Sequence, residues 1–459
     1  MKRYYIVGSY DNVTPQTVEQ ENSVNVIIPL MIENKLQHGI GNYLYDLNQL
    51  GIYPDEDGID ILCLAALIYL ADTRISRDKH SQDSWTREIS ITLPVFNVEK
   101  WKSQKGVFAK MLTYLTGDKW DVSFVKRDIS LMACEQRIQL SNFDAATLFS
   151  GGMDSLIGTI NNLECGKKVA LISHAADGYT KNVQTTLLSR FNSQYSSNSP
   201  QYINLWMSYE QNIIQNGGEE NTTRSRSFLF IASGVCAVSG MEGVSVLSVP
   251  ENALIALNIA LDKLRVGSHS THTTHPFYLA LWNEVLSGLE MNISVNNPYW
   301  NKTKGEMAVE CLNKEFLKSV LPISISCSSP LKARWKGNAP QHCGYCVPCI
   351  IRRAAISKAF GINNDLTPYS QNDLRIIISN HAKNEGIQLR SFQVAIERVK
   401  YSPQLAQFLI HKSGPLDNSS EYLTELSDVY LRGLLEVDSF IQQNTSQNQT
   451  TEDVQNATI

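Results

Sequence analysis

Five short apolar segments alternate with five segments of helical periodicity between residues 145 and 313. The apolar segments are predicted strands and lie at 145–149, 169–173, 202–207, 244–249 and 293–295. The helical segments lie near 155–165, 180–193, 223–239, 276–289 and 303–313. Strands that alternate with helices form a parallel sheet covered on both faces. The pattern therefore predicts an α/β fold with a doubly wound parallel sheet.

The segment after the first predicted strand is typical of an anion-binding turn. It reads Leu-Phe-Ser-Gly-Gly-Met-Asp-Ser from Leu148 to Ser155. Its glycines let the backbone approach an anion, and its serines and aspartate are residue types that cap helix N-termini, where unpaired N–H groups point outward. A capped turn without a ligand is the structural alternative. The residues predicted to hold the anion are Ser150, Gly151, Gly152, Asp154 and Ser155.

Two basic residues begin helical segments at the same edge of the predicted sheet. Arg226 follows the third strand and Lys304 follows the fifth. A cation beside the positive end of a helix dipole is unfavourable unless an anion lies near it. Both side chains are therefore predicted to face a bound phosphate group, with a solvated surface position as the alternative for each.

Other polar residues at this edge leave alternatives open. His174 follows the second strand and is either a structural hydrogen-bonding group or a ligand contact. Glu251 and Asn252 follow the fourth strand and suit either the edge of a purine-like base or a capped turn. The histidine repeat that ends at His275 is interpreted as a helix start rather than a metal site, because Pro276 suits a first helical turn.

Four cysteines have the most specific spacing in the chain. Fifteen residues separate the first from the second, and two residues separate each later pair. Four thiolates form closed tetrahedral zinc sites without an open position for a catalytic water, so the predicted site is structural. Six basic residues and no acidic residue lie between 327 and 360, where they balance the thiolates or face phosphate or a partner. The predicted zinc ligands are Cys327, Cys343, Cys346 and Cys349.

The glycine-containing turn resembles the PP-loop of the ATP pyrophosphatase superfamily, written S-G-G-x-D-S. Together with the pattern C-x(n)-C-G-x-C-x-x-C, it makes residues from about 145 to 360 resemble the 7-cyano-7-deazaguanine synthase family, the QueC-like proteins. The resemblance implies an adenine-nucleotide α-hydrolase-like sheet with strand order 3-2-1-4-5. It also implies that the turn binds ATP with Mg²⁺ and that the cysteines bind Zn²⁺.

The chemistry of that family implies an AMP- and pyrophosphate-forming C–N ligase. ATP adenylates the carboxylate of 7-carboxy-7-deazaguanine, ammonia attacks to give an amide, and a second adenylation dehydrates the amide to a nitrile. Carried over by position, the implied catalytic residues are Asp154, Arg226 and Lys304, the two cations lying near the phosphates. Lys304 would stabilise the α-phosphate transition state or the departing pyrophosphate.

The chain is longer than a housekeeping synthase of this family. It adds about 140 residues before the PP-loop-like turn and about 100 after the cysteines. In this it resembles the enlarged QueC-like proteins of anti-phage operons, such as those of the Qat defence system. The resemblance implies that the acyl acceptor is ammonia or an amine of a partner protein from such an operon, and it leaves open whether the product is an amide or a nitrile.

Changes in pattern divide the chain into four predicted regions. These are an N-terminal α+β domain at 1–142, a PP-loop domain with the zinc motif at 143–361, a helical region at 362–441 and a disordered polar tail at 442–459. The elements predicted in the first region are strands at 3–7, 23–28 and 89–93, helices at 61–71 and 106–115, and a strand or hairpin at 128–140. The polar cluster 83–88 is either a recognition surface or a polar edge beside a buried tryptophan.

Composition limits the class of partner. A net charge of −5 opposes general coating of nucleic acid, and no apolar run of about 18 residues is present to span a bilayer. Without a signal-peptide pattern, we expect a cytoplasmic protein with reduced thiols that binds a small deazapurine substrate and neither nucleic acid nor membrane. The oligomeric state is left open, with a homodimer among the options. Two other functions stay open: a PP-loop enzyme that modifies tRNA, and a non-catalytic nucleotide sensor.

Overall fold

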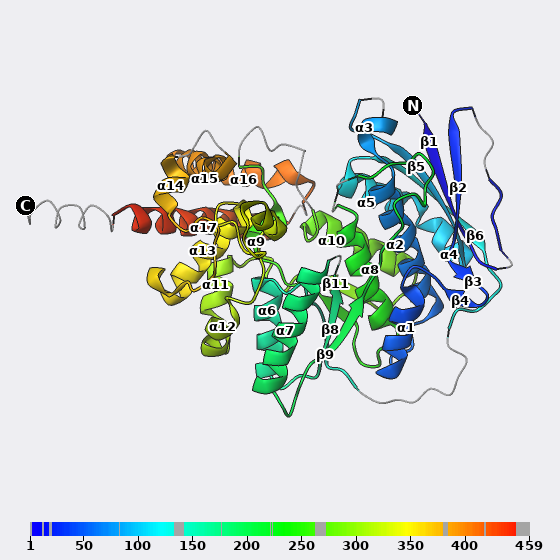
Figure 1. Cartoon of the computed structure of the whole chain (residues 1–459), viewed down its shortest axis with the longest axis horizontal. Helices are drawn as coiled ribbons and strands as arrows, with labels where there is room; N and C mark the ends of the chain where they lie inside the picture. The colour runs from blue at the N-terminus through cyan, green and yellow to red at the C-terminus, as the bar shows by residue number, and fades with distance from the viewer. Residues whose placement is uncertain are drawn as a thin grey trace, which may run out of the picture.

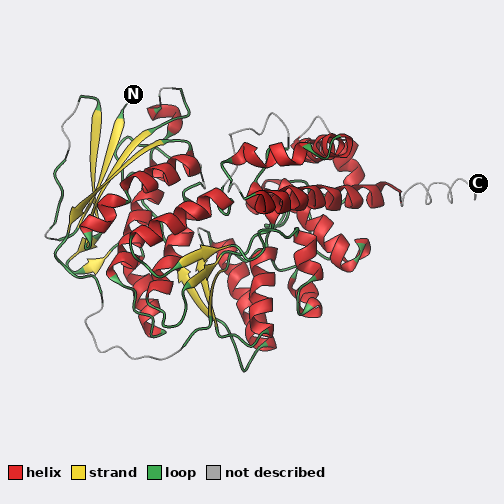
Figure 2. Ribbon diagram, turned by 180° about the vertical axis from the view of Figure 1, so that it is seen from behind, coloured by secondary structure: helices red, strands yellow, loops and turns green. Residues whose placement is uncertain are grey.

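Two parallel β-sheets organise the chain, and helices surround both (Figures 1 and 2). The computed structural model describes residues 2–11, 13–17, 21–81, 83–132, 142–175, 177–220, 222, 224–261, 272–379, 384–416 and 419–446. A four-stranded sheet lies near the N-terminus, a five-stranded sheet lies centrally, and the C-terminal helices lie at the opposite end (Figure 1). The predicted α/β class is confirmed.

The five-stranded sheet is built from the five predicted apolar segments. Its order is β11-β10-β7-β8-β9, and every neighbouring pair is parallel. From the central strand β7 the chain moves to one side for β8 and β9 and to the other side for β10 and β11. The loop after β7 therefore lies where the strand order reverses, which is where such sheets bind ligands. The strands are β7 (Ala145–Leu148), β8 (Val169–His174), β9 (Gln201–Leu205), β10 (Val246–Ser248) and β11 (Ser294–Asn296).

Alternate residues of the central strands enter different cores, as expected for a sheet covered on both faces. Leu148 and Ile172 pack into one core. Val169 and Leu171 pack into the other. The covering helices are α6 (Met153–Glu164) and α7 (Gly178–Gln194) on one face, and α8 (Arg226–Ser239) and α10 (Pro276–Gly288) on the other.

The N-terminal sheet corrects the predicted α+β arrangement. Its order is β2-β1-β5-β6 and all three neighbouring pairs are parallel, which makes this region α/β as well. Among the strands of the described residues, only β3 (Met31–Ile32) and β4 (Lys35–Leu36) pair antiparallel, in a short hairpin. The strands of the sheet are β1 (Arg3–Ser9), β2 (Ser23–Pro29), β5 (Glu88–Val95) and β6 (Lys119–Lys126).

The last strand of this sheet comes earlier than predicted. Trp120, Val122 and Phe124 of β6 are buried at alternate positions, which is the period of a strand. Residues 128–132 form no strand, and residues 133–140 of the predicted segment lie outside the described residues. The helices of this region are α1 (Ile40–Gln49), α2 (Glu56–Arg74), α3 (Arg77–His80), α4 (Val98–Ser103) and α5 (Lys105–Thr116).

Helix α2 joins the two sheets. It contacts β1 and β5 on one side and α8 on the other, and nearly all of its residues are buried, as the apolar run at 61–71 predicts. A single core contains Ile6 and Ile91 of the N-terminal sheet together with Val235 of α8 and Trp282 of α10. The N-terminal region and the five-stranded sheet therefore stabilise each other through shared burial of apolar surface.

A buried ion cluster joins α2, α3 and the N-terminal sheet. Arg87 is 1% exposed and pairs with Asp72 at 2.5 Å and with Asp118 at 2.6 Å. Arg77 pairs with Asp118 at 2.7 Å. Because both aspartates lie at the ends of secondary-structure elements, the cluster fixes how α2 meets the first residues of β5 and β6.

The polar cluster at 83–88 contains one residue of the buried ion cluster, Arg87, and one exposed aromatic residue, Trp85. Asp83 accepts hydrogen bonds from the backbone N–H groups of Trp85 (3.0 Å) and Thr86 (2.7 Å), so it closes a turn. The prediction of a buried tryptophan is wrong: Trp85 is 38% exposed and its ring lies 5.0 Å from the guanidinium of Arg224.

The C-terminal region is helical, as predicted, and packs into a second core that it shares with residues of 253–261 and 350–354. Its longest helix, α17, buries Val429, Leu434 and Val437 and continues to Ser446. The first residues of the predicted disordered tail are therefore helical, and residues 447–459 lie outside the described residues. The helices are α13 (Val347–Phe360), α14 (Leu374–Ser379), α15 (Asn384–Tyr401), α16 (Leu405–Leu409) and α17 (Ser420–Ser446).

We predict that Asp118→Ala destabilises the protein by about 3–5 kcal/mol, because it removes one of the two aspartates that balance the buried guanidinium groups of Arg77 and Arg87. Thermal unfolding measures the effect. Asp128→Ala is the control, because Asp128 forms an exposed ion pair with Lys126 and should leave the melting temperature unchanged. Equal melting temperatures for the two variants would contradict the structural role of the cluster.

Candidate functional site

The glycine-containing turn at 148–155 connects β7 to α6. Gly151 has a φ of +80°, which an L side chain rarely adopts, and Gly152 is the N-cap of α6. The hydroxyl of Ser150 accepts from the Gly152 N–H at 3.2 Å, and the hydroxyl of Ser155 donates to the Gly152 carbonyl at 3.0 Å. The two hydroxyl oxygens lie 3.2 Å apart. The predicted residues thus form one compact turn at a helix N-terminus.

Two adjoining cavities open over this turn. The smaller, of about 180 Å³, is lined by the turn, Glu251, Lys304 and Ser326. The larger, of about 650 Å³, is lined on its other sides by His174 and Arg226. Ser150 and Ser155 line both cavities, so the turn forms their common wall. The larger cavity lies within the range of about 300–1,000 Å³ that is usual for small-molecule sites, whereas the smaller one lies below it.

A buried ion pair crosses the smaller cavity. The Nζ atom of Lys304 lies 2.9 Å from Oδ2 of Asp154, and both side chains are buried. The amide of Asn252 donates to the same oxygen at 2.9 Å. The other carboxylate oxygen, Oδ1, is buried and accepts no hydrogen bond from a donor group within the described residues. A proton on a neighbouring acid or a bound cation would satisfy it.

Lys304 is held at the start of the short helix α11 (Lys304–Val309). Its preceding residue, Thr303, forms a capping box with Glu306: the Thr303 hydroxyl accepts from the Glu306 N–H at 3.1 Å, and the Glu306 carboxylate accepts from the Thr303 N–H at 2.9 Å. The anion beside Lys304 is a group of the protein itself, the carboxylate of Asp154. The T-x-x-E spacing of Thr303 and Glu306 is the sequence signal of this helix start.

Neighbouring carboxyl groups have opposite pKa shifts. Burial raises the pKa of Glu251 well above its usual range, and the carboxylate of Asp154 raises it further. Burial also opposes ionisation of Asp154, but the ammonium of Lys304 and the hydrogen bonds from Glu251, Lys304 and Asn252 together outweigh it and lower the pKa of Asp154. The two shifts favour a proton on Glu251 and the ionised form of Asp154.

Asn252 is a helix cap, which was one of its two predicted roles. Its Oδ1 accepts from the Ile255 N–H at 3.2 Å at the start of α9 (Ala253–Leu257). Its Nδ2 donates to both Asp154 and Glu251. Because its amide is fully used and its side chain is buried, Asn252 is not placed to read the edge of a base.

Arg226 lies at the start of α8 and lines the larger cavity, whereas Lys304 lines the smaller one. The guanidinium of Arg226 donates to Nδ1 of His174 at 3.3 Å and to its carbonyl at 3.3 Å. Burial and the charge of Arg226 lower the pKa of His174 to about 3, so its ring is neutral with the proton on Nε2. His174 is therefore a positioning partner of Arg226 as well as part of the cavity wall.

The histidines near the start of α10 are not gathered as metal ligands. Nδ1 of His275 accepts from the Phe277 N–H at 3.2 Å and caps α10, and Nδ1 of His272 lies 3.3 Å from the hydroxyl of Tyr114. His269 lies outside the described residues. The predicted helix start is confirmed.

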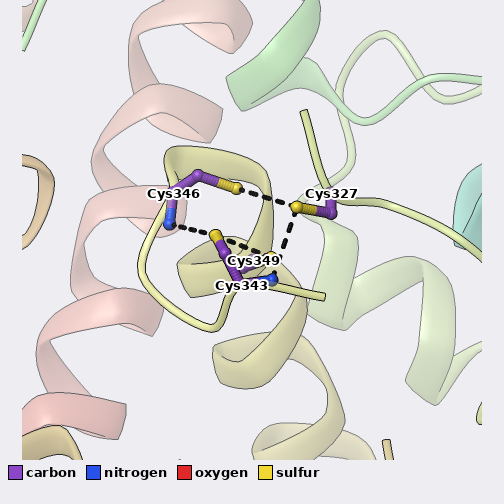
Figure 3. Close-up of side chains that lie close together, drawn as sticks. All are labelled: Cys327, Cys343, Cys346 and Cys349. Atoms are coloured by element: carbon purple, nitrogen blue, oxygen red, sulfur yellow. Dashed lines mark hydrogen bonds between the residues drawn. The ribbon is translucent and has the colours of Figure 1, made fainter. Parts of the chain in front are cut away.

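The four predicted cysteines lie together (Figure 3). Their Sγ atoms are all within 4.8 Å of one another, with 3.9 Å between Cys327 and Cys346 and 3.9 Å between Cys343 and Cys349. Tetrahedral zinc with Zn–S bonds of about 2.3 Å places its sulfur atoms about 3.8 Å apart. The cluster could therefore hold a metal ion and is compatible with zinc.

Residues 325 and 326, which precede Cys327, lie against the glycine-containing turn. The Ile325 N–H donates to the Gly151 carbonyl at 2.9 Å, and the Ser326 N–H donates to Nε2 of His342 at 3.0 Å. Arg352, which is fully buried, donates to the hydroxyl of Ser326 at 3.3 Å. The turn is thus hydrogen-bonded to the segment that leads into Cys327, a contact that no local sequence pattern reveals.

Two of the basic residues near the cysteines are structural. Arg352 donates to the carbonyl of Leu321 at 2.6 Å, and Arg353 donates to the carbonyl of Asn372 at 2.6 Å. Both arginines are buried, so neither is available to a phosphate or a partner. Lys332 is exposed and lines the mouth of the larger cavity.

The chain matches no protein-family model, and no curated protein is similar to it in sequence. Within the described ranges, none of the helices is both long enough and apolar enough to cross a bilayer.

We predict that His174 makes folding sensitive to acid. Its pKa of about 3 in the folded protein lies below the ordinary value of 6.5, so the unfolded chain binds a proton that the folded protein rejects. The stability that neutral His174 allows is fully present above about pH 6.5 and is lost as the pH falls towards 3. At about pH 5 the loss amounts to about 2 kcal/mol. His174→Asn, whose Oδ1 can still accept from Arg226, should therefore lose less stability than the wild type between about pH 7 and pH 5.

Chemical denaturation of both proteins at the two pH values measures this difference. The control is His411→Asn, because His411 is exposed and should keep the acid sensitivity of the wild type. An unchanged pH dependence in His174→Asn would show that His174 is not kept neutral by its surroundings.

Proposed function

We propose that this protein is an AMP- and pyrophosphate-forming ligase of the 7-cyano-7-deazaguanine synthase type. The observation that carries the proposal is the buried Lys304–Asp154 ion pair, which faces a glycine-containing turn at the carboxyl edge of a parallel sheet. In chain order this sheet runs third, second, first, fourth and fifth strand, the order implied by the resemblance to PP-loop proteins. The cluster of four cysteines beside the turn supports the same family.

ATP fits the smaller cavity by its phosphates. The N–H groups at the start of α6 and the hydroxyls of Ser150 and Ser155 suit the β- and γ-phosphates that leave as pyrophosphate. Mg²⁺ prefers carboxylate oxygen together with phosphate oxygens, and Asp154, whose Oδ1 receives no N–H or hydroxyl donor within the described residues, is the group that would hold it. When bound, Mg²⁺ would neutralise phosphate charge.

The proposed first step is adenylation of a carboxylate. A carboxylate oxygen of the deazapurine attacks the α-phosphorus of ATP, the bond from that phosphorus to the α–β bridging oxygen breaks, and pyrophosphate leaves with the electron pair. Lys304 would stabilise the charge that develops on the departing oxygen, a role supported by its burial and by the contact of its ammonium with Asp154.

The proposed second step transfers the acyl group to an amine. The amine nitrogen attacks the activated carbonyl carbon, the bond from that carbon to the AMP oxygen breaks, and the nitrogen loses one proton. Arg226 and neutral His174 line the larger cavity, where they suit the anionic and hydrogen-bonding groups of a carboxylated base. The acceptor is ammonia or an amine of a partner protein, and anti-phage defence is the proposed context.

The proposed metal at the cysteine cluster is Zn²⁺ in a structural role. The four thiolates would hold it with no open position for a substrate. Its contribution would be to keep Ile325 and Ser326 in place as part of the wall of the ATP site.

Incubation with ATP, Mg²⁺, ammonium and 7-carboxy-7-deazaguanine should release AMP and pyrophosphate. We predict that Lys304→Ala lowers kcat by about 10²–10³-fold, because it removes charge stabilisation at the α-phosphate. The matched control is Lys302→Ala, two residues earlier, whose ammonium forms a half-exposed ion pair with Glu310 and should leave kcat unchanged. Release of ADP and phosphate instead would contradict the proposal, and nucleotide binding without turnover by the intact protein would favour a sensor.

Purified protein should contain one Zn²⁺ per chain by elemental analysis. We predict that Cys343→Ser loses most of this zinc and melts at a lower temperature, because the thiolate it removes is one of four ligands. Cys165→Ser should retain the metal, since Cys165 is exposed and lies outside the cluster. Equal zinc content in both variants would exclude the cluster as the metal site.

A further inference from the structure

The C-terminal helix α17 reaches the residues on either side of Lys304. Its Glu436 is only 8% exposed and accepts three hydrogen bonds. Oε1 accepts from the Gly305 N–H at 2.9 Å, and Oε2 accepts from the Thr303 hydroxyl at 2.6 Å. The ammonium of Lys358 donates to Oε2 at 3.1 Å. The chain positions immediately before and after Lys304 are therefore both bound to one carboxylate.

Attachment of α17 does not require this carboxylate. The helix already packs through Leu426, Val429 and Leu434 into the apolar core of the C-terminal region. A buried carboxylate is unfavourable unless it is fully hydrogen-bonded, so an apolar residue would attach the helix at lower cost. The role of Glu436 therefore depends on the groups to which it is hydrogen-bonded.

The groups that Glu436 binds belong to a helix start that is weak on its own. Helix α11 spans only Lys304–Val309, and a helix this short is marginal in isolation. The capping box satisfies the N–H groups of Thr303 and Glu306, and Glu436 satisfies that of Gly305. Its negative charge also lies at the positive end of the helix dipole.

The packing at this contact is close. A Cβ atom on Gly305 would collide with the carboxylate of Glu436, which would then have to move away from the start of α11. A second bond lies beside it, where the guanidinium of Arg432 contacts Oε1 of Glu306 at 2.8 Å. The start of α11 is thus held against α17 with little freedom to shift.

We propose that Glu436 is a positioning residue for Lys304. By binding Thr303 and Gly305, it fixes the direction in which the Lys304 side chain leaves α11 and keeps the ammonium 2.9 Å from Asp154, over the turn. The C-terminal helix is therefore part of the catalytic framework. The catalytic consequence of this inference rests on the proposed ligase function.

The test compares Glu436→Ala with Asp428→Ala, which removes a negative charge from an exposed position of the same helix. At a temperature well below either melting point, Glu436→Ala should lower kcat for pyrophosphate release by about 10- to 100-fold, because small displacements of a catalytic group have effects of this size. Its KM for ATP should change by less than about threefold, since the turn itself is untouched. Asp428→Ala should match the wild type.

Gly305→Ala provides a second variant. It should lower kcat as Glu436→Ala does, and the double variant should be no worse than Glu436→Ala alone, because removal of the carboxylate leaves room for the new methyl group. Additive losses in the double variant, or a kcat equal to that of the wild type in Glu436→Ala, would overturn the inference.

Hydrogen–deuterium exchange of residues 303–309 separates this inference from the proposed function. Glu436→Ala should speed exchange in this segment, and Asp428→Ala should not. If the wild type releases no pyrophosphate, the proposed ligase function fails, and exchange still decides whether Glu436 holds the start of α11. Equal exchange in the two variants would exclude the positioning role whatever the reaction.

Discussion

The ion pair between Lys304 and Asp154 is the contact on which the candidate site depends, and the sheet determines that it forms. Asp154 follows β7, Lys304 follows β11, and Asn252, which donates to the same carboxylate oxygen, follows β10. These three strands are neighbours in the order β11-β10-β7, so parallel pairing brings three distant chain segments to one carboxylate. A buried ion pair is stable only when hydrogen bonds satisfy its groups. This requirement fixes α6, α9 and α11 relative to one another.

The strands of the central sheet, the glycine-containing turn and the cysteine cluster could be predicted from the sequence, because each depends on residues close together in the chain. The contacts that hold them together could not. The bond from the Ile325 N–H to the Gly151 carbonyl joins two backbones and has no side-chain signal. Glu436 lies in a helix whose pattern indicates only an amphipathic face. The parallel order of the N-terminal sheet was also missed, since a period of two identifies a strand but not its direction or neighbours.

The regions before and after the five-stranded sheet each contact one of the two helices that begin at a basic residue of the site, α8 at Arg226 and α11 at Lys304. On the N-terminal side, Asp72 of α2 accepts from the Ser225 N–H at 3.1 Å, directly before Arg226 begins α8. On the C-terminal side, Glu436 of α17 holds the start of α11 around Lys304. In both cases a buried carboxylate from an outer region satisfies the N-terminus of a helix of the site. The regions on either side of the five-stranded sheet therefore support the geometry of the site from two sides.

The packing of α2 against α8 has a consequence for biosynthesis. Helix α2 is complete at Arg74, but α8, which covers its second apolar face, begins only at Arg226. At a ribosomal rate of about 5–20 residues per second, the nascent chain presents that face uncovered for about 8–30 s. Exposed apolar surface over such an interval favours aggregation or chaperone binding. Yield of the native protein in cells should accordingly depend on translation speed and chaperone supply more than the stability of the finished fold suggests.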